Sequence, residues 1–258
     1  MKLQKIFINN RFGESLETAI KYDGKKEKYP TVLFVSGFDE DFHEYANTFD
    51  EIAEKLVKKA FLTIQFSFAG LGKSEGDYKK TTLERQTNQI KDIFESIRKN
   101  PKVNPRRIGI IAQSFGVPSL ILALPLPSKS LVFISGVVNP YEEMKEIFVK
   151  RNSFNPTGTS TLPRSDGKFT AVGPGFWKSL KNINLHSCLK THQKPLLILH
   201  GSADTHVPVD EVKGFYQKFS GKKSLKIYEG GDHGITDVPK AMHQEFLDDI
   251  VSWLKKTL

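Results

Sequence analysis

Short apolar runs rich in β-branched residues alternate with segments of helical periodicity along most of the chain. Such runs predict buried strands, and apolar positions at helical spacing predict amphipathic helices. Because strands that alternate with helices are joined by right-handed crossovers, we expect an α/β protein with a mostly parallel, eight-stranded sheet covered on both faces. The strands are expected over 3–9, 16–22, 31–36, 61–66, from 107 to the turn before Ser114, 130–136, 195–200 and 224–229. The helices are expected over 43–59, 82–99, 117–123, 141–151, 209–219 and 238–257.

The alternation of strands and helices is interrupted once, between about 138 and 190. Within this segment a stretch rich in Gly, Pro, Ser and Thr runs from Asn152 to Pro174. The first two strands are joined by turn-forming residues, so we expect them to pair antiparallel. Since 258 residues suit one sizeable core, we expect a single domain over 1–258, with the interrupting segment as a small cap insertion above the strand ends.

Ser114 lies at the point where an apolar strand gives way to a helix, in Ala112-Gln113-Ser114-Phe115-Gly116. A tight strand-to-helix turn that presents a nucleophile forces its central residue into a strained conformation. Small residues must then stand two positions before and two after it, and Ala112 and Gly116 meet that need. A serine at this place can also serve only to cap a helix. Whether Ser114 is a nucleophile or only a helix cap depends on whether the chain supplies catalytic partners for it.

Two further expected strands end in chemically distinctive residues. Asp204 lies in His200-Gly201-Ser202-Ala203-Asp204, and His233 lies in Gly231-Asp232-His233-Gly234. Because functional groups collect at the carboxyl ends of the strands of an open α/β sheet, we expect Ser114, Asp204 and His233 to meet there. Asp232 is a second candidate for the acid, but a neighbour of His233 in a tight loop usually points elsewhere, so we favour Asp204. The other histidines are expected to be structural or exposed.

The chain resembles the α/β-hydrolase superfamily over nearly its whole length. The order of the three residues, serine, acid and then histidine, is the order found in that superfamily. The supporting segments are closest to small bacterial carboxylesterases of the cinnamoyl/feruloyl-esterase-like and monoacylglycerol-lipase-like type. They comprise residues 34–38, 66–76, 112–116, 200–204 and 231–234. Three positions depart from the pattern of these enzymes. Ser36 stands in place of His, Ser67 in place of Asp, and Ala112 in place of the first Gly of the serine turn.

The resemblance and the chemistry imply the same roles for these residues. Ser114 would attack a carbonyl carbon, His233 would accept its proton, and Asp204 would orient the histidine. The backbone amides of Phe38 and Phe115 would form an oxyanion hole, without a metal or a cofactor. An apolar or aromatic acyl pocket is expected under the cap. Its candidate residues are Phe154, Phe169, Phe176, Trp177 and His206.

The acidic cluster before the first expected helix has two interpretations. Asp39, Glu40, Asp41, His43 and Glu44 resemble a metal site in composition, but their spacing matches no metal motif. Acidic residues also favour the positive end of a helix dipole. We therefore expect this cluster to mark the start of the helix over 43–59.

The net charge of +9 comes from basic residues spread over the whole chain. No basic block is interleaved with aromatic residues, so we expect a solvated basic surface and no nucleic-acid site. The cap holds 8 basic and 4 acidic residues, a slight bias toward anionic or phenolic substrates. No apolar run reaches the length of a signal peptide or a membrane span, so a cytoplasmic protein without a membrane partner is expected. The single cysteine, Cys188, excludes a disulfide within this chain.

These observations together predict a serine hydrolase that cleaves carboxylic esters of small substrates, as a monomer or homodimer. A thioesterase, an amidase or a small peptidase would use the same three residues. A binding protein that kept the fold and lost turnover is the alternative from another class, because fold does not decide function. The retention of Ser114, Asp204 and His233 argues against it.

Overall fold

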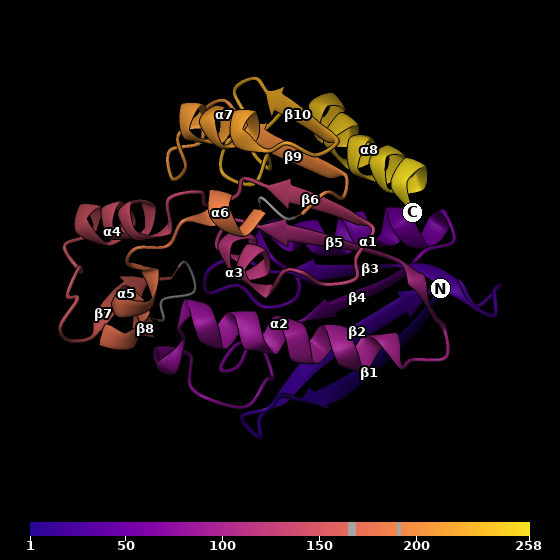
Figure 1. The fold of residues 1–258 in the computed structure, drawn as a ribbon, viewed down its shortest axis with the longest axis horizontal. Helices are drawn as coiled ribbons and strands as arrows, with labels where there is room; N and C mark the ends of the chain where they lie inside the picture. The colour runs from indigo at the N-terminus through magenta and orange to yellow at the C-terminus, as the bar shows by residue number, and fades with distance from the viewer. Residues whose placement is uncertain (165–168, 190–191) are drawn as a thin grey trace.

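An eight-stranded sheet with the strand order β1-β2-β4-β3-β5-β6-β9-β10 organises the computed structural model, which describes residues 1–164, 169–189 and 192–258 (Figure 1). The strands span Lys2–Asn9 (β1), Ser15–Tyr22 (β2), Tyr29–Val35 (β3), Leu62–Phe66 (β4), Val103–Gln113 (β5), Ser130–Ile134 (β6), Leu196–Gly201 (β9) and Lys223–Tyr228 (β10). β1 pairs antiparallel with β2, and β2 with β4, whereas all other neighbours are parallel. The predicted α/β-hydrolase architecture is thereby confirmed.

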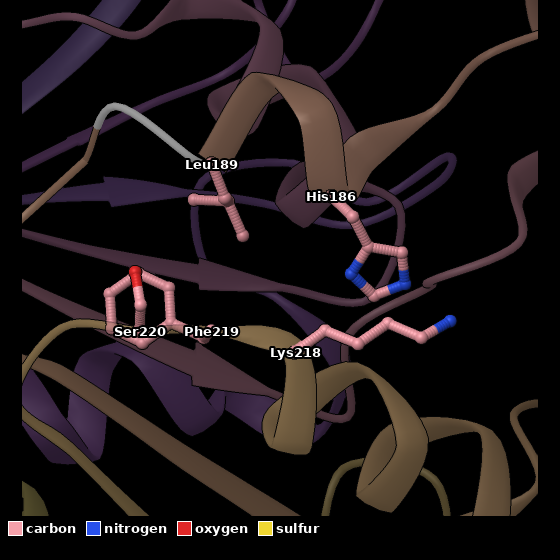
Figure 2. A pocket seen from close by; sticks show the side chains of 5 residues that line it. All are labelled: His186, Leu189, Lys218, Phe219 and Ser220. Carbon is pink, nitrogen blue, oxygen red and sulfur yellow. The ribbon is translucent and has the colours of Figure 1, made fainter.

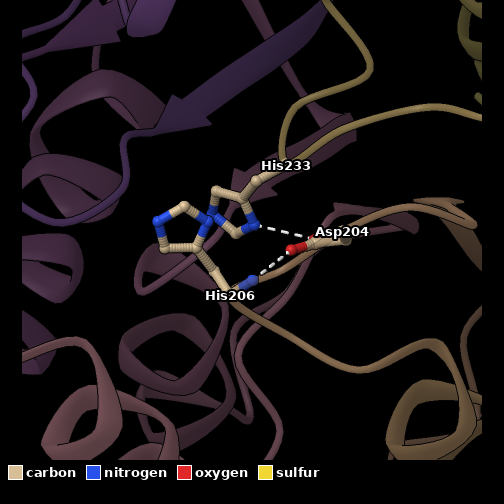
Figure 3. Close-up of side chains that lie close together, drawn as sticks. All are labelled: Asp204, His206 and His233. Carbon is tan, nitrogen blue, oxygen red and sulfur yellow. Dashed lines mark hydrogen bonds and ion pairs between the residues drawn. The ribbon is translucent and has the colours of Figure 1, made fainter. Parts of the chain in front are cut away.

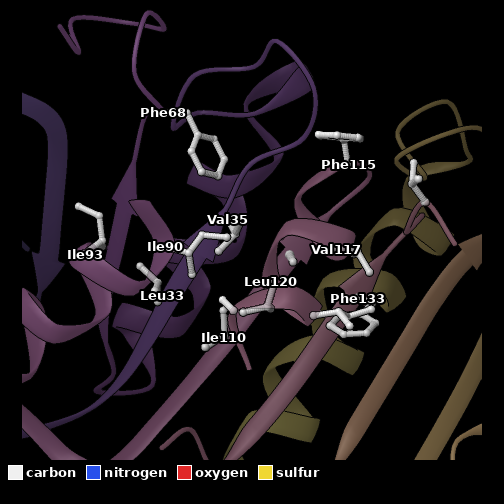
Figure 4. Packing of buried hydrophobic residues seen from close by; sticks show 14 of the residues in the cluster. Leu33, Val35, Phe68, Ile90, Ile93, Ile110, Phe115, Val117, Leu120 and Phe133 are labelled. Atoms are coloured by element: carbon white, nitrogen blue, oxygen red, sulfur yellow. The ribbon is translucent and has the colours of Figure 1, made fainter. Parts of the chain in front are cut away.

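Helices cover both faces of this sheet. The helices are α1 (Thr48–Lys58) and α8 (Lys240–Thr257) on one face, and α2 (Leu83–Arg98), α3 (Gly116–Ala123), α6 (Leu185–Leu189) and α7 (Val209–Lys218) on the other. Figure 4 shows Leu33 of β3 and Ile110 of β5 packed with Ile90 of α2 and Leu120 of α3. The next residues, Phe34 and Ile111, belong to the core of the opposite face. Burial on both faces explains why the central strands are continuous apolar runs. Every helix within the described ranges is too short or too polar to cross a bilayer.

The insertion lies beyond the carboxyl ends of the parallel strands, at the left of Figure 1. It contains α4 (Pro140–Lys150), the antiparallel hairpin of β7 (Ser160–Pro163) and β8 (Phe169–Val172), and α5 (Pro174–Leu180). The cap boundary of about 190 expected from the sequence also takes in α6, which instead packs on α3 in the main core. Two short 3-10 helices, η1 (Tyr45–Asn47) and η2 (Tyr78–Lys80), complete the described elements.

The helix expected over 43–59 begins later, at Thr48. Glu44, Ala46 and Asn47 have φ angles of 63°, 54° and 59°, in the left-handed region, so they cannot continue a right-handed helix. The acidic cluster at 39–44 is therefore not the first turn of α1, which carries Asp50 and Glu51 instead. The cluster lies in the loop after β3 (residues 36–44), which we call the β3 loop.

Candidate active site

Ser114 lies on the turn between β5 and α3 with a φ of 49°, in the left-handed region. Its backbone N–H donates to the Ile134 carbonyl over 2.9 Å, and its own carbonyl accepts from Val137 N–H over 3.1 Å. A Cβ atom added to Gly116 would lie 2.5 Å from the backbone oxygen of Ser36. The turn therefore requires glycine at this position, and the strain at Ser114 is held by neighbouring strands.

The side chains of Ser114, His233 and Asp204 form one hydrogen-bonded chain. His233 Nε2 lies 2.9 Å from Ser114 Oγ, and His233 Nδ1 lies 2.8 Å from Asp204 Oδ2. Figure 3 shows the His233–Asp204 contact, with the ring of His206 beside that of His233. The structure thus brings together the three residues that the sequence singled out. An imidazole with Nδ1–H donated to Asp204 presents Nε2 to Ser114 as a proton acceptor.

Asp204 is fixed by further donors at the end of β9. Its Oδ1 accepts from the backbone N–H groups of His206 and Val207, over 2.8 and 3.0 Å. Burial acts to raise the pKa of Asp204, but the hydrogen bond from His233 and these two amide donors outweigh it and lower the pKa. Asp204 is thus held as a carboxylate. His200 lies behind it, its Nε2 within 2.9 Å of the Val207 carbonyl, and burial lowers the pKa of its imidazole.

The loops that carry Asp204 and His233 pack backbone against backbone. A Cβ atom added to Gly201 would lie 2.2 Å from the Gly231 carbonyl oxygen, so the approach requires glycine. Asp232, the second candidate for the acid, is engaged elsewhere. Its carboxylate accepts from Thr236 N–H, Thr236 Oγ1 and Asp237 N–H, over 2.7 to 3.1 Å. Asp232 thus shapes the loop, and Asp204 is the carboxylate on His233.

The backbone N–H groups of Phe38 and Phe115 donate no hydrogen bond to any described residue. Both residues flank Ser114, since Phe115 follows it and a Cβ atom added to Gly37 would lie 3.1 Å from Ser114 Cβ. Two unengaged donors beside a nucleophile are what an oxyanion requires. The buried ring of Phe115 and that of Phe38 contact edge to face, with centroids 6.0 Å apart.

The Glu44 carboxyl accepts hydrogen bonds from two backbone amides at or next to the β3 loop. Its Oε2 accepts from Gly37 N–H over 2.6 Å, and its Oε1 accepts from Tyr45 N–H over 3.3 Å. Burial raises the pKa of Glu44 to about 8, although the bond from Gly37 opposes the shift. Burial likewise raises the pKa of Glu40 to about 7, an effect that the charge of Arg164 partly offsets. At neutral pH Glu44 is therefore largely protonated and Glu40 about half protonated.

The β3 loop is also joined to the cap. Arg164, just after β7, donates from Nη1 to the Asp39 carbonyl over 3.1 Å and to Asp39 Oδ1 over 2.6 Å. Thr170 of β8 hydrogen-bonds the other Asp39 oxygen, Oδ2. Asp39 N–H donates to the Tyr78 hydroxyl over 2.9 Å. The insertion and the loop that carries the Phe38 donor are thus one connected unit.

Ser114 and His233 open into a cavity of about 530 Å³ between the strand ends and the cap. This volume suits a small ligand. The cavity combines an apolar wall with charged and polar groups. The apolar wall comprises Phe38, Met144, Ile147, Leu162 and Pro163. The charged and polar lining residues are Asp39, Glu40, Glu44, Tyr45, Gln113, Arg151, Arg164, Thr205, His206 and Asp232.

Of the five residues expected to line the acyl pocket, the structure places only His206 among the described lining residues. Phe176 and Trp177 are fully buried, and Phe154 packs against Trp177 with ring centroids 4.8 Å apart. Phe169 of β8 is 70% exposed and is not among the described lining residues of the cavity. The cap aromatics instead pack together as a core that supports Phe38 and Phe115. Composition alone could not separate a pocket wall from the layer behind it.

Two other groupings of side chains are chemically less informative. A second pocket, between α6 and the end of α7, is lined by His186, Leu189 and Lys218 among others and has a volume of about 10 Å³ (Figure 2). It is too small for an organic ligand. Asp204, His206 and His233 have potential metal-ligating atoms within 4.8 Å of one another. Both nitrogens of His233 are already hydrogen-bonded, to Ser114 and to Asp204, so this grouping fits proton transfer better than metal binding.

Known proteins resemble this chain only distantly in sequence. No protein-family profile matches it. The mitochondrial palmitoyl-protein thioesterase ABHD10 of mouse (Mus musculus) is 24% identical over 204 residues. The match covers 73% of this chain and 63% of the mouse protein, so the chain spans less than two thirds of that relative.

The fold resembles solved structures over nearly the whole chain. Est1E from Butyrivibrio proteoclasticus, solved with ferulic acid bound, aligns with a TM-score of 0.80 at 20% identity and covers 98% of each chain. The alpha/beta hydrolase GrgF from Penicillium sp. sh18 also gives 0.80, at 13% identity, over 100% of this chain and 99% of that one. At these identities the likeness establishes the fold. The chain therefore has the α/β-hydrolase fold that its motifs predict.

Proposed function

We propose that this protein is a serine hydrolase that cleaves carboxylic ester bonds of small substrates through Ser114, His233 and Asp204. The observation that carries the proposal is the continuous chain of hydrogen bonds from Ser114 Oγ through His233 to Asp204, at 2.9 and 2.8 Å. It opens into a cavity of about 530 Å³. The likeness in fold to Est1E, which was solved with ferulic acid, supports the same proposal.

In the first half of the reaction, Ser114 Oγ attacks the ester carbonyl carbon. The Ser114 O–H bond breaks, and its proton passes to His233 Nε2 as the bond to carbon forms. The tetrahedral intermediate then expels the alcohol, which takes the proton from Nε2, and an acyl-serine remains. Asp204, a carboxylate hydrogen-bonded to Nδ1, stabilises the imidazolium that forms between these steps.

In the second half, water replaces the alcohol. His233 takes a proton from the water as its oxygen attacks the acyl carbon, and returns it to Ser114 Oγ as the acid leaves. In both halves the carbonyl oxygen becomes an anion. The N–H groups of Phe38 and Phe115 are the donors for it, and removal of one such donor costs about 3 kcal/mol in comparable sites. Because these amides belong to the backbone, Ser36 in place of the usual histidine leaves them intact.

The lining of the cavity supports a substrate with a small apolar acyl group. Met144, Ile147 and Leu162 provide apolar lining in the cavity that contains Ser114. Burial of apolar acyl carbons against such a lining is favourable by roughly 25 cal/mol per Å². The cavity volume of about 530 Å³ favours short acyl chains or a single aromatic ring over long ones.

A thioester is the second candidate substrate. The palmitoyl-protein thioesterase ABHD10 matches 73% of this chain, and thioesters react through the same serine chemistry. The leaving group would be a thiol in place of an alcohol, and His233 would return the proton to sulfur. The other steps are unchanged.

The test is hydrolysis of p-nitrophenyl acetate, butyrate and octanoate and of methyl ferulate by the wild type and by Ser114→Ala. We expect turnover that vanishes in the variant, with the shorter chains or the aryl ester preferred. Butyryl thioesters assayed in parallel would distinguish the second candidate. A folded wild type that hydrolyses none of these and does not react with a fluorophosphonate probe at Ser114 would overturn the proposal.

A further inference from the structure

A second hollow, of about 230 Å³, adjoins the cavity that contains Ser114. It lies between the end of α4 and the loop after β9, and four of its lining residues also line the main cavity. These shared residues are Ile147, Arg151, Thr205 and His206. Its other lining residues are Glu146 and Lys150. The two hollows thus form one site with two compartments.

The position of His233 decides which half of a substrate occupies the second compartment. The leaving group must depart beside His233 Nε2, because that nitrogen supplies its proton. The His206 ring lies beside the His233 ring, with centroids 4.8 Å apart, and lines both compartments. The β3 loop with Phe38 and Glu44 lines the main cavity and takes no part in the second compartment. The second compartment therefore lies on the leaving-group side.

Arg151 lines this site, and its guanidinium group has no carboxylate partner among the described residues. Arg164 is held by Asp39, and Lys150 pairs with Glu146 over 2.7 Å. Arg151 makes no ion pair within the described part of the chain and is exposed at the rim of both compartments. A guanidinium group that pairs with no carboxylate of the protein can bind a carboxylate or a phosphate through two parallel hydrogen bonds.

The carboxylates that line the two compartments are engaged with groups other than Arg151. Asp39 pairs with Arg164, Glu146 pairs with Lys150, and Asp232 accepts hydrogen bonds from Thr236 and Asp237.

Burial, together with the charge of His233, lowers the pKa of His206, so His206 is neutral at pH 7. Burial raises the pKa values of Glu40 and Glu44 to about 7 and about 8, so at pH 7 Glu44 is largely uncharged and Glu40 carries about half of its full charge. The chain as a whole carries +9, which further favours the approach of anions.

We propose, building on the ester hydrolysis proposed above, that the second compartment receives the leaving group and that Arg151 binds a carboxylate or phosphate on that group. The preferred substrates are then small acyl esters or thioesters whose alcohol or thiol portion is anionic. Neutral acyl chains occupy the main cavity against Met144 and Leu162. The acyl portion itself is expected to carry no charge.

The test compares two acetate esters that differ only in the charge of the leaving group, para-acetoxybenzoate and para-acetoxybenzamide. Arg151→Gln should raise KM and lower kcat/KM for the benzoate by about tenfold, since it removes a charge-assisted contact, and leave the benzamide unchanged. Arg151→Lys should retain part of the preference. Para-acetoxyphenyl phosphate tests whether phosphate binds as carboxylate does, and p-nitrophenyl hemisuccinate places the charge on the acyl side instead.

Lys145→Gln is the matched control, because Lys145 is also a basic residue of the insertion, on α4, but is not among the described residues that line either compartment. It should leave both acetate esters unchanged. An equal response of the benzoate and the benzamide to Arg151→Gln would overturn the proposal, as would a loss seen with the hemisuccinate alone. Rising salt should weaken the preference for the benzoate in the wild type, because the contact is exposed.

Calorimetric binding of para-hydroxybenzoate and para-hydroxybenzamide to the wild type and to Arg151→Gln separates this proposal from that of ester hydrolysis. If no ester is turned over and the benzoate still binds through Arg151, ester hydrolysis fails and the anion site stands. If Ser114-dependent turnover is found and Arg151→Gln affects neither binding nor KM, the anion site fails and ester hydrolysis stands.

Discussion

The Gly37 amide donates a hydrogen bond of 2.6 Å to the Glu44 carboxyl, one residue before Phe38, whose N–H is the proposed oxyanion donor. Glu44 is buried, and the Gly37 backbone lies against Ser114. Since Gly37 and Phe38 are consecutive, a bond that holds the Gly37 amide restricts the positions that the Phe38 N–H can take. Glu44 is thus placed to act as a positioning residue, through the backbone rather than on the substrate.

We therefore expect Glu44→Ala to lower kcat by about tenfold with little change in KM, because a misdirected donor loses part of its roughly 3 kcal/mol effect on the transition state. Glu44→Gln keeps an oxygen acceptor for Gly37 and should restore kcat to near the wild-type value. Steady-state kinetics with p-nitrophenyl butyrate measures both. An equal loss in the Gln and Ala variants would show that the carboxyl acts otherwise.

Glu143 provides a control that separates the loss of a buried carboxyl from the loss of the positioning role of Glu44. It is 5% exposed and accepts from the Val138 and Asn139 amides over 3.0 and 3.2 Å, and burial raises its pKa to about 8. It does not line the main cavity within the described residues. Glu143→Ala should lower the melting temperature as Glu44→Ala does and leave kcat of the folded enzyme unchanged.

The raised pKa values of these carboxyls predict that the protein loses stability as the pH rises. Unfolding returns Glu44 and Glu143 from pKa values of about 8 toward 4.5, so the folded state binds more protons between those limits. The contribution of these two protonated carboxyls to the free energy of unfolding is complete below pH 4.5 and is lost as pH rises through 8. Each group lowers the free energy of unfolding by at most about 1.4 kcal/mol per pH unit. Urea denaturation from pH 5 to 8 should show this fall, and Glu44→Gln should reduce its slope. Identical slopes would contradict it.

The layers of the fold could be predicted because burial on both faces leaves continuous apolar strands in the sequence. The strand pattern also located Ser114, Asp204 and His233, since Ser114 follows β5 directly and the other two lie in the short loops after β9 and β10. The start of α1 could not be predicted in this way. The residues before it, Glu44, Ala46 and Asn47, adopt positive φ angles, and the Glu44 side chain accepts from the distant Gly37 amide, features that have no periodic signal in the sequence.

The residues that line the cavity could not be predicted from the sequence either. Phe176 and Met144 are both apolar residues of the insertion, yet Phe176 packs behind the wall and Met144 lines it. Their difference comes from how α4 and α5 pack on each other, which is tertiary information. Arg151 is one of eight basic residues in the insertion, and it is singled out by lining both compartments without a carboxylate partner within the described residues.

Asp204→Asn should lower kcat by on the order of a thousandfold or more, because an asparagine amide cannot hold the His233 tautomer that accepts the Ser114 proton. The two amides that donate to Asp204 Oδ1 would retain their acceptor, so the loop should stay in place. Asp232→Asn is the matched control next to His233 and should cost little activity, since the Asp232 carboxylate bonds only Thr236 and Asp237 among the described residues. Stopped assays on p-nitrophenyl acetate distinguish them. A larger loss at Asp232 would reverse the assignment.

Gly116→Ala should destabilise the fold and abolish activity together. The added methyl would lie 2.5 Å from the Ser36 carbonyl oxygen and 2.7 Å from that of Val35, and neither backbone atom can move without shifting β3. Overpacking of this kind costs about 1 to 3 kcal/mol. Gly214→Ala, within α7, meets nothing within 4 Å and should instead raise the free energy of unfolding by about 0.5 to 1 kcal/mol, with activity retained. Thermal unfolding and fluorophosphonate labelling of Ser114 measure both effects. A stable, fully labelled Gly116→Ala protein would mean that the turn at Ser114 is looser than its contacts require.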